Sequence, residues 1–205
     1  MRVDGRLQRS LKTKEKLLKA AEKVFIEQGY QNTTIKEINK EANIGHGTFY
    51  IHFPEGKDEI LTHLMNNVME EFYSVADIEF TPNSKENAFE VIREQVFHFI
   101  SLAEKYKNLL MIFYEGIGVS SLLKEKWEDI LNKFIDRIVK DIRYSQDQSL
   151  AKKQINPEVA SRILLYSGER FLWEIVTDKN KLPISEIADN LTHVYMFGLY
   201  KGPND

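Results

Sequence analysis

The chain has 205 residues, 42% of them hydrophobic, and a net charge of −3, so it has enough apolar surface for a folded core. It has no cysteine, which excludes disulfide bonds and thiolate metal sites. The N-terminal residues contain no secretory hydrophobic segment, and no apolar run is long enough to span a bilayer. We therefore expect a soluble, cytoplasmic protein that does not bind membranes.

The charge is distributed unevenly along the chain. The first 23 residues carry eight Lys or Arg against three Asp or Glu, whereas residues 61–205 carry 17 against 22. A basic N-terminal segment on an acidic body is consistent with a site for a polyanion. Lys12, Lys14 and Lys16 are then either contacts to a nucleic-acid backbone or part of a solvated helix face, and the charge pattern alone does not separate these alternatives.

The N-terminal quarter predicts three helices. Residues 13–28 carry apolar side chains at helical spacing, and Gly29 ends this helix. Thr34 and Glu37 fit a capping box that starts a second helix, which continues to about Ala42. Asn and Gly both tolerate left-handed backbone, so we expect a tight turn at residues 43–45 before a short helix over residues 46–52.

The remainder of the chain also predicts helices. Pro157 fits the first position of a helix with Asn156 as its cap, and Ser185 is expected to cap the last helix. The expected ranges after the N-terminal quarter are 57–75, 84–106, 108–117, 121–144, 157–177 and 185–200. Because no segment reads as a strand, the fold class is all-α, with about nine helices.

Two short helices joined by a three-residue turn are typical of a helix-turn-helix unit, whose second helix enters the DNA major groove. Here the second helix is residues 46–52. Four apolar residues are expected to form the small interior that joins the two helices: Ile38, Ala42, Ile44 and Phe49.

Residues 13–66 carry several spaced markers: Gly29-Tyr30, Thr33-Thr34-Ile35, Asn43-Ile44, Gly47-Thr48-Phe49-Tyr50-Ile51-His52-Phe53 and Lys57-Asp58-Glu59-Ile60-Leu61. With these markers, the segment resembles the TetR/AcrR family of repressors. Beyond them, the chain is similar to the family only in helical content and length. The resemblance implies a three-helix DNA-binding domain over residues 1–57. It also implies a larger helical domain for ligand binding and dimerisation over residues 58–205.

The resemblance also implies which residues contact DNA. Thr34 begins the second helix and would donate to a phosphate, while His46 leads the recognition helix and would read a base edge. Tyr50 and His52 would fix the orientation on the phosphates, and Lys57 would add a cationic contact. The full implied set is Thr33, Thr34, Gly45, His46, Gly47, Thr48, Tyr50, His52 and Lys57.

Four features depart from the family pattern. Asn39 stands where the family prefers alanine, and Gly45 replaces a Ser-type helix cap. Ile51 stands where many members carry a polar or aromatic residue. Glu55-Gly56 adds one residue before Lys57, which shifts that lysine by one position relative to the family pattern.

Aromatic residues in the C-terminal part are core residues in most helical proteins, but in a TetR-like fold some line a ligand cavity. The candidates for ligand contact are Phe72, Phe97, Phe113, Tyr114, Glu115, Trp127 and Phe171. The last two helices each carry an apolar stripe, and in the family such helices form the interface of a dimer. The candidates for this interface are Val159, Ile163, Tyr166, Ile187, Leu191 and Val194.

The sequence is therefore interpreted as a ligand-responsive repressor. It would bind a roughly palindromic double-stranded operator as a homodimer, and an unidentified effector, compatible with a lipophilic small molecule, would release it. An enzyme is disfavoured, because no nucleophile–base pair, metal cluster or phosphate-binding glycine loop is visible. We expect no cofactor and no metal, since His46 and His52 lack a third ligand nearby. A helical interaction protein that has lost DNA binding, and an activator, remain alternatives.

Overall fold

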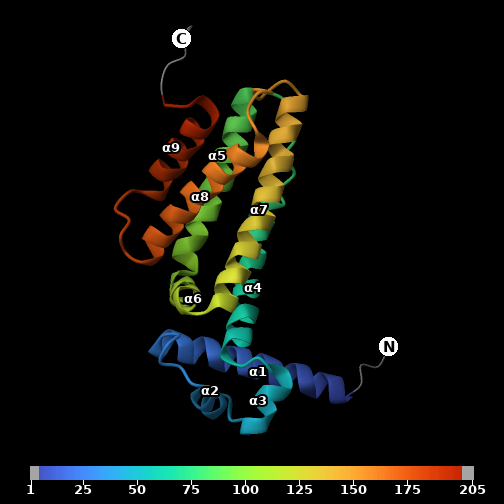
Figure 1. Cartoon of the computed structure of the whole chain (residues 1–205), viewed down its shortest axis with the longest axis vertical. Coiled ribbons are helices and arrows are strands. Elements are labelled where there is room, and N and C mark those ends of the chain that lie inside the picture. Colours follow the sequence, from blue (N-terminus) through green and yellow to red (C-terminus); the bar gives the residue numbers. More distant parts are fainter. Residues whose placement is uncertain (1–4, 200–205) are drawn as a thin grey trace. The chain divides into compact units, whose positions relative to one another are not determined.

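The computed structural model describes residues 5–199, which form nine α-helices and no strand (Figure 1). This confirms the all-helical prediction. The helices are α1 (Gly5–Gln28), α2 (Ile35–Ala42), α3 (His46–His52), α4 (Lys57–Ala76), α5 (Lys85–Lys105), α6 (Lys107–Val119), α7 (Ser121–Asp147), α8 (Pro157–Val176) and α9 (Ile184–Phe197).

The helices pack into two compact units. The first unit contains the residues up to 69 together with residues 108–127, and the second contains residues 70–107 and those from 128 onward. Helices α4 and α7 contribute residues to both units. The first unit is therefore discontinuous in sequence, and it is larger than the DNA-binding domain that we expect at residues 1–57. The domain boundary at residue 57 remains a prediction about which residues bind DNA.

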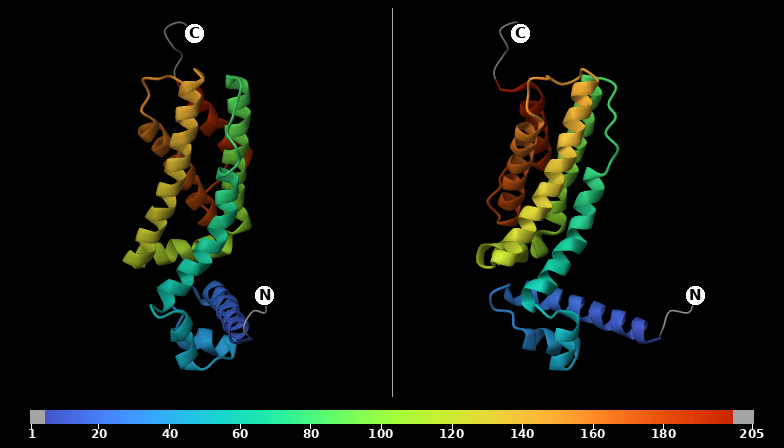
Figure 2. Two further views of the ribbon diagram at one scale, coloured as in Figure 1. Left: turned by 90° about the vertical axis from the view of Figure 1, so that its right-hand side faces the viewer. Right: turned by 45° about the vertical axis from the view of Figure 1, so that its right-hand side comes forward.

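Helices α1, α2 and α3 form the N-terminal part of the first unit (Figure 2). Helix α1 begins at Gly5, well before the predicted start at residue 13. Residues 6–12 contain no proline or glycine, and Arg9 Nε donates to the Gly5 carbonyl at 3.0 Å, so nothing stops the helix from extending. At its other end, Gly29 has φ 80°, a left-handed conformation that ends the helix as predicted.

The turn between α2 and α3 follows the prediction at one residue and departs from it at another. Asn43 has φ 51° and ψ 51°, the left-handed conformation expected of it. Gly45 has φ −68° and ψ 146° and is extended, so the expectation that it also adopts left-handed backbone is wrong. Asn43 alone reverses the chain, because its N–H already bonds the last carbonyls of α2.

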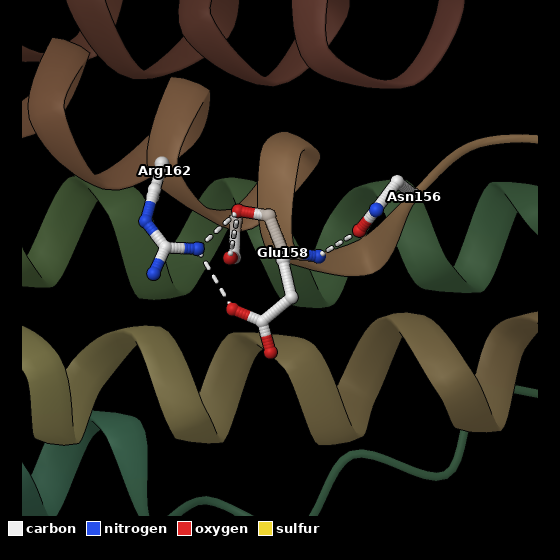
Figure 3. A network of polar contacts seen from close by, with 4 residues as sticks. Asn156, Glu158 and Arg162 are labelled. Atoms are coloured by element: carbon white, nitrogen blue, oxygen red, sulfur yellow. Dashed lines mark hydrogen bonds and ion pairs between the residues drawn. The ribbon is translucent and has the colours of Figure 1, made fainter.

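In the second unit, α5, α8 and α9 lie side by side (Figures 1 and 2). As predicted, Asn156 caps α8, where its Oδ1 accepts from the Glu158 N–H at 2.8 Å (Figure 3). Ser185 does not cap α9, because the helix already begins at Ile184, with Pro183 in the cap position. The predicted end of this helix at Tyr200 lies outside the described residues.

Candidate nucleic-acid interface

Helix α2 is fixed at its start by the predicted capping box. Thr34 Oγ1 accepts from the Glu37 N–H at 3.3 Å, and a Glu37 carboxylate oxygen accepts from the Thr34 N–H at 2.9 Å. The same carboxylate oxygen accepts the Thr34 hydroxyl proton at 2.7 Å, and these bonds lower the pKa of Glu37. A phosphate contact by the exposed Thr34 hydroxyl therefore requires that hydroxyl to leave Glu37.

Helix α3 buries one side and exposes the other. Phe49 is fully buried and its ring lies 5.5 Å from that of Phe53, which anchors the helix in the first unit. His46 and Tyr50 are exposed, and their rings meet edge to face at 5.5 Å. Gly45 and Gly47 are also exposed, and Thr48 and His52 are partly so. The structure thus brings six predicted DNA-binding residues together on or beside one short helix.

Ile51 is the residue of α3 that sequence reasoning left out of the candidate site. Its side chain is 77% exposed, more than any other large hydrophobic side chain among residues 5–199. Helical spacing could have found it, because a residue two positions from the buried Phe49 must point away from the core. The sequence analysis named Ile51 only as a departure from the family pattern and gave it no contact.

Thr33 is buried and Lys57 is partly buried, and the polar side-chain atoms of both are bonded within the protein. The Thr33 side chain is only 2% exposed, and its hydroxyl donates to the Gly29 carbonyl at 2.8 Å. Lys57 Nζ donates to the carbonyls of Tyr30 at 2.8 Å and of Thr33 at 3.1 Å. The loop between α1 and α2 has carbonyls without helical partners, and these two side chains supply the missing donors. Partial burial also lowers the pKa of Lys57.

Tyr30 lies at the centre of a polar network inside the first unit. Its hydroxyl donates to the carboxylate of Asp58, which also accepts from the Ser120 hydroxyl at 2.6 Å. Burial, followed by the bond to Asp58, raises the pKa of Tyr30. The Tyr30 N–H donates to Glu115 at 2.9 Å. Glu115, a predicted ligand contact, therefore already serves as an acceptor for the loop that precedes α2.

Two further residues of the first unit carry polar groups in its interior. Asn39 is buried, and neither atom of its side-chain amide has a hydrogen-bond partner. Alanine, which the family prefers there, would leave no such atoms.

Lys14 Nζ lies 3.3 Å from His63 Nε2, so this lysine is turned toward α4. Partial burial, followed by the charge of Lys14, lowers the pKa of His63.

The predicted ligand contacts are divided between the two units. Four lie in the first unit: Phe113, Tyr114, Glu115 and Trp127. Three lie in the second: Phe72, Phe97 and Phe171. Phe72 is fully buried and its ring meets that of Phe99 at 5.0 Å. Phe99 in turn meets Phe134, which stacks on Tyr73 at 4.9 Å.

The predicted dimer contacts are mostly exposed. Val159, Ile163 and Tyr166 form an exposed stripe on α8, along a groove of about 750 Å³ that Arg162 and Phe171 also line. Arg162 is held there by its bonds to Glu158 (Figure 3). On α9, Val194 is exposed and Leu191 is half-buried. Ile187 is buried and belongs to the core of the second unit, so its assignment to the interface is wrong.

The described part of the chain offers no group of three or more His, Asp or Glu side chains that could hold a metal ion. None of its helices is both long and apolar enough to cross a membrane.

Comparison with known proteins gives consistent results. Residues 17–64 match the model for bacterial regulatory proteins of the tetR family. The HTH-type transcriptional regulator YvdT of Bacillus subtilis is 25% identical over 183 residues, 81% of this chain and 86% of that one. The structure of FadR from Bacillus subtilis in complex with stearoyl-CoA superposes with a TM-score of 0.70 at 18% identity, covering 91% and 99% of the two chains. The SmeT–triclosan complex gives 0.68 at 22% identity, covering 89% and 90%. The N-terminal segment of the chain therefore matches the tetR family of bacterial regulatory proteins, and the whole chain shares the fold of these solved regulators.

Proposed function

We propose that this regulator is a repressor that binds a roughly palindromic operator as a homodimer in the cytoplasm and is released by a small-molecule effector. The observation that carries the proposal is the exposed face of α3, where His46, Gly47 and Tyr50 stand clear of the core on a helix packed against the capped α2. In a helix-turn-helix unit, the exposed helix that follows the turn is the one that enters the major groove.

The charges around α3 favour a polyanionic partner. The helix contains no Asp or Glu, so its exposed face does not repel phosphates. Exposed lysines stand on the neighbouring helices, among them Lys36 and Lys40 on α2 and Lys12 and Lys16 on α1. Such residues contribute sequence-independent, salt-dependent affinity, while base contacts come from α3.

The α8 stripe supports the homodimer. Val159, Ile163 and Tyr166 expose a contiguous apolar surface, which is costly in water unless a partner covers it. A second copy of the chain, related by a two-fold axis, would place the same stripe against itself. Two recognition helices would then meet successive major grooves about 34–36 Å apart.

The interior of the second unit supports a lipophilic effector with at least one polar group. Phe72, Phe99, Phe134 and Tyr73 form an aromatic cluster, and the Tyr73 hydroxyl is buried without a hydrogen-bond partner. A ligand that brought an acceptor to this hydroxyl would satisfy it. FadR with stearoyl-CoA and SmeT with triclosan show that proteins of this fold bind lipophilic molecules.

The test is DNA binding by the purified ligand-free protein. The probe is the region upstream of its own gene, with unrelated DNA as competitor, at two salt concentrations. We expect specific binding that weakens as salt rises. Binding no stronger than to unrelated DNA, for this region and for duplexes selected from a random-sequence library, would overturn the proposal.

A pair of tyrosine variants assigns the binding to α3. Tyr50 and Tyr114 are both 44% exposed and both belong to the first unit. We expect Tyr50→Ala to weaken operator binding about tenfold or more, and Tyr114→Ala to leave it unchanged, with both variants folded by circular dichroism. Equal effects of the two changes would remove α3 as the reading helix.

A further inference from the structure

The outer face of α3 is centred on two residues. In an α-helix successive residues are about 100° apart, so the residues two before and two after Phe49 lie on the side of the helix opposite it. These residues are Gly47 and Ile51. Because Phe49 is fully buried, the two occupy the most outward part of the helix.

Ile51 is the side chain that projects from this centre. It is 77% exposed, and Gly47, one turn earlier, has no side chain beside it. A Cβ atom built on Gly47 meets no atom within 4 Å, so packing within the protein does not require glycine there. The helix thus presents bare backbone at one turn and a branched apolar side chain at the next.

An isoleucine in this position cannot serve the phosphates, because it offers neither charge nor a hydrogen bond. His46 and Tyr50 on one flank of the face, and Thr48 and His52 on the other, can donate to phosphates or base edges. On the floor of the major groove, the C5-methyl group of thymine is the distinctive apolar feature among the base edges. The chemistry of Ile51 matches that group.

We propose that Ile51 determines operator specificity by packing on a thymine methyl group in each half-site, and that Gly47 lets the helix backbone approach the groove closely enough for this contact. The inference rests on the proposed function, since it assumes that α3 enters the major groove. It adds the base that the operator must carry and the residue that selects it. Isoleucine suits the task because its β-branched side chain has few rotamers to lose on binding.

The experiment replaces thymine by uracil, which removes only the methyl group. The full-length protein first selects a duplex from random-sequence DNA, and each thymine of that duplex is then changed to uracil, one symmetric pair at a time. The dissociation constants are measured for the wild-type protein, for Ile51→Ala and for Ile26→Ala. Ile26 is an exposed isoleucine on α1 in the same unit and serves as the matched control.

We expect one symmetric pair of thymines to matter for the wild-type protein. Loss of a methyl-sized apolar contact corresponds to about fourfold in affinity, and loss at both half-sites to about 15-fold. Ile51→Ala should bind the thymine and uracil duplexes equally, whereas Ile26→Ala should retain the wild-type preference. Because Ile51 is exposed, the alanine variant is expected to fold normally, which circular dichroism checks.

The inference is overturned if no thymine pair shows a methyl effect, or if the effect persists in Ile51→Ala. Either result leaves the proposed function intact, since the wild-type protein still binds the selected duplex. Failure to select any duplex over unrelated DNA overturns the proposed function and this inference with it.

Discussion

Two buried threonines, one in each unit, differ in how their hydroxyl groups are bonded. Thr33 in the first unit is buried, and its hydroxyl donates to the Gly29 carbonyl. Thr192 in the second unit is fully buried, and its hydroxyl has no hydrogen-bond partner. The hydroxyl of Tyr73, also in the second unit, is buried without a partner. In the first unit, the side-chain amide of Asn39 is also buried without a hydrogen-bond partner.

A bonded polar group holds its surroundings in a single geometry, whereas an unpaired one does not. A fully bonded polar network such as Tyr30–Asp58–Ser120 makes alternative packings costly, because each rearrangement leaves a buried group unpaired. In the second unit the Ser161 hydroxyl donates to the Glu158 carbonyl, but the buried hydroxyls of Tyr73 and Thr192 are unpaired, so repacking around these two costs less. The first unit therefore suits a rigid reading head, and the second suits a body that changes state when a ligand satisfies its polar groups.

The largest expected effect comes from breaking the network at Lys57. Lys57→Ala removes the donor shared by the carbonyls of Tyr30 and Thr33, and partly buried carbonyls left unpaired are costly. We expect the free energy of unfolding to fall by about 2 kcal/mol, measured by urea denaturation. Lys36→Ala, at an exposed lysine of α2, is the matched control and should change it by less than about 0.5 kcal/mol.

The salt dependence of DNA binding separates this interior role from the one that the sequence resemblance implies. A lysine that contacts phosphate contributes about one unit to the slope of log affinity against log salt concentration. We expect Lys57→Ala to leave that slope unchanged under conditions where the variant is folded. A slope reduced by about two, one unit for each subunit of the dimer, would restore Lys57 as a phosphate contact.

The two buried threonines give a smaller effect of opposite sign. Valine has nearly the shape of threonine and lacks the hydroxyl. Thr33→Val leaves the Gly29 carbonyl unpaired and should lower the free energy of unfolding by about 1–2 kcal/mol. Thr192→Val removes an unpaired buried hydroxyl and should raise it by about 1 kcal/mol. Thermal or urea unfolding measures both, and changes of the same sign would contradict the contrast between the units.

Much of the fold could be predicted because its signals are local. Gly29 at the end of α1, the capping box of Thr34 and Glu37, and Asn156 before Pro157 each act within four residues along the chain. Ser185 failed as a cap because the helix already begins at Ile184, with Pro183 in the cap position two residues before Ser185 and without a side-chain cap bond. Local signals place a helix, but competing signals set its exact first residue.

The parts of the site that sequence reasoning missed depend on distant residues. In the sequence, Lys57 has the pattern of an exposed cation. In the fold, its ammonium group binds two loop carbonyls that lie 24 and 27 residues away along the chain. Glu115 meets Tyr30 across 85 residues, and no pattern in the sequence links the two. Ile51 is different, since its outward position follows from helical spacing, but the family pattern offers no contact to carry over to an isoleucine there.

The second unit offers a pH test at Asp141. Burial raises the pKa of Asp141 to about 6, although the charges of Arg137 and Lys140 act in the opposite direction. The folded state therefore binds a proton more tightly than the unfolded state, where the pKa is about 3.9. The resulting stability is fully present below about pH 4 and is lost as the pH rises toward 6. Asp141→Asn should remove this dependence.

At pH 7, Asp141→Asn should raise the free energy of unfolding by on the order of 1 kcal/mol, a figure discounted because the side chain is partly exposed. Urea denaturation at pH 4 and at pH 7 measures the change. Asp136→Asn, at an exposed aspartate of the same helix, is the control and should shift neither value by more than about 0.5 kcal/mol. A gain from Asp141→Asn that is equal at both pH values would show that its charge is not the cause.

The smallest expected change in stability is at Gly47, where folding and binding should respond in opposite directions. Alanine is favoured over glycine inside a helix by about 0.5–1 kcal/mol, and a Cβ at this position meets no atom within 4 Å. Gly47→Ala should therefore raise the free energy of unfolding by up to that amount. Operator affinity should fall, because the added methyl group stands where the backbone approaches the groove. A variant that is more stable and binds as tightly as the wild type would show that Gly47 is not kept for DNA.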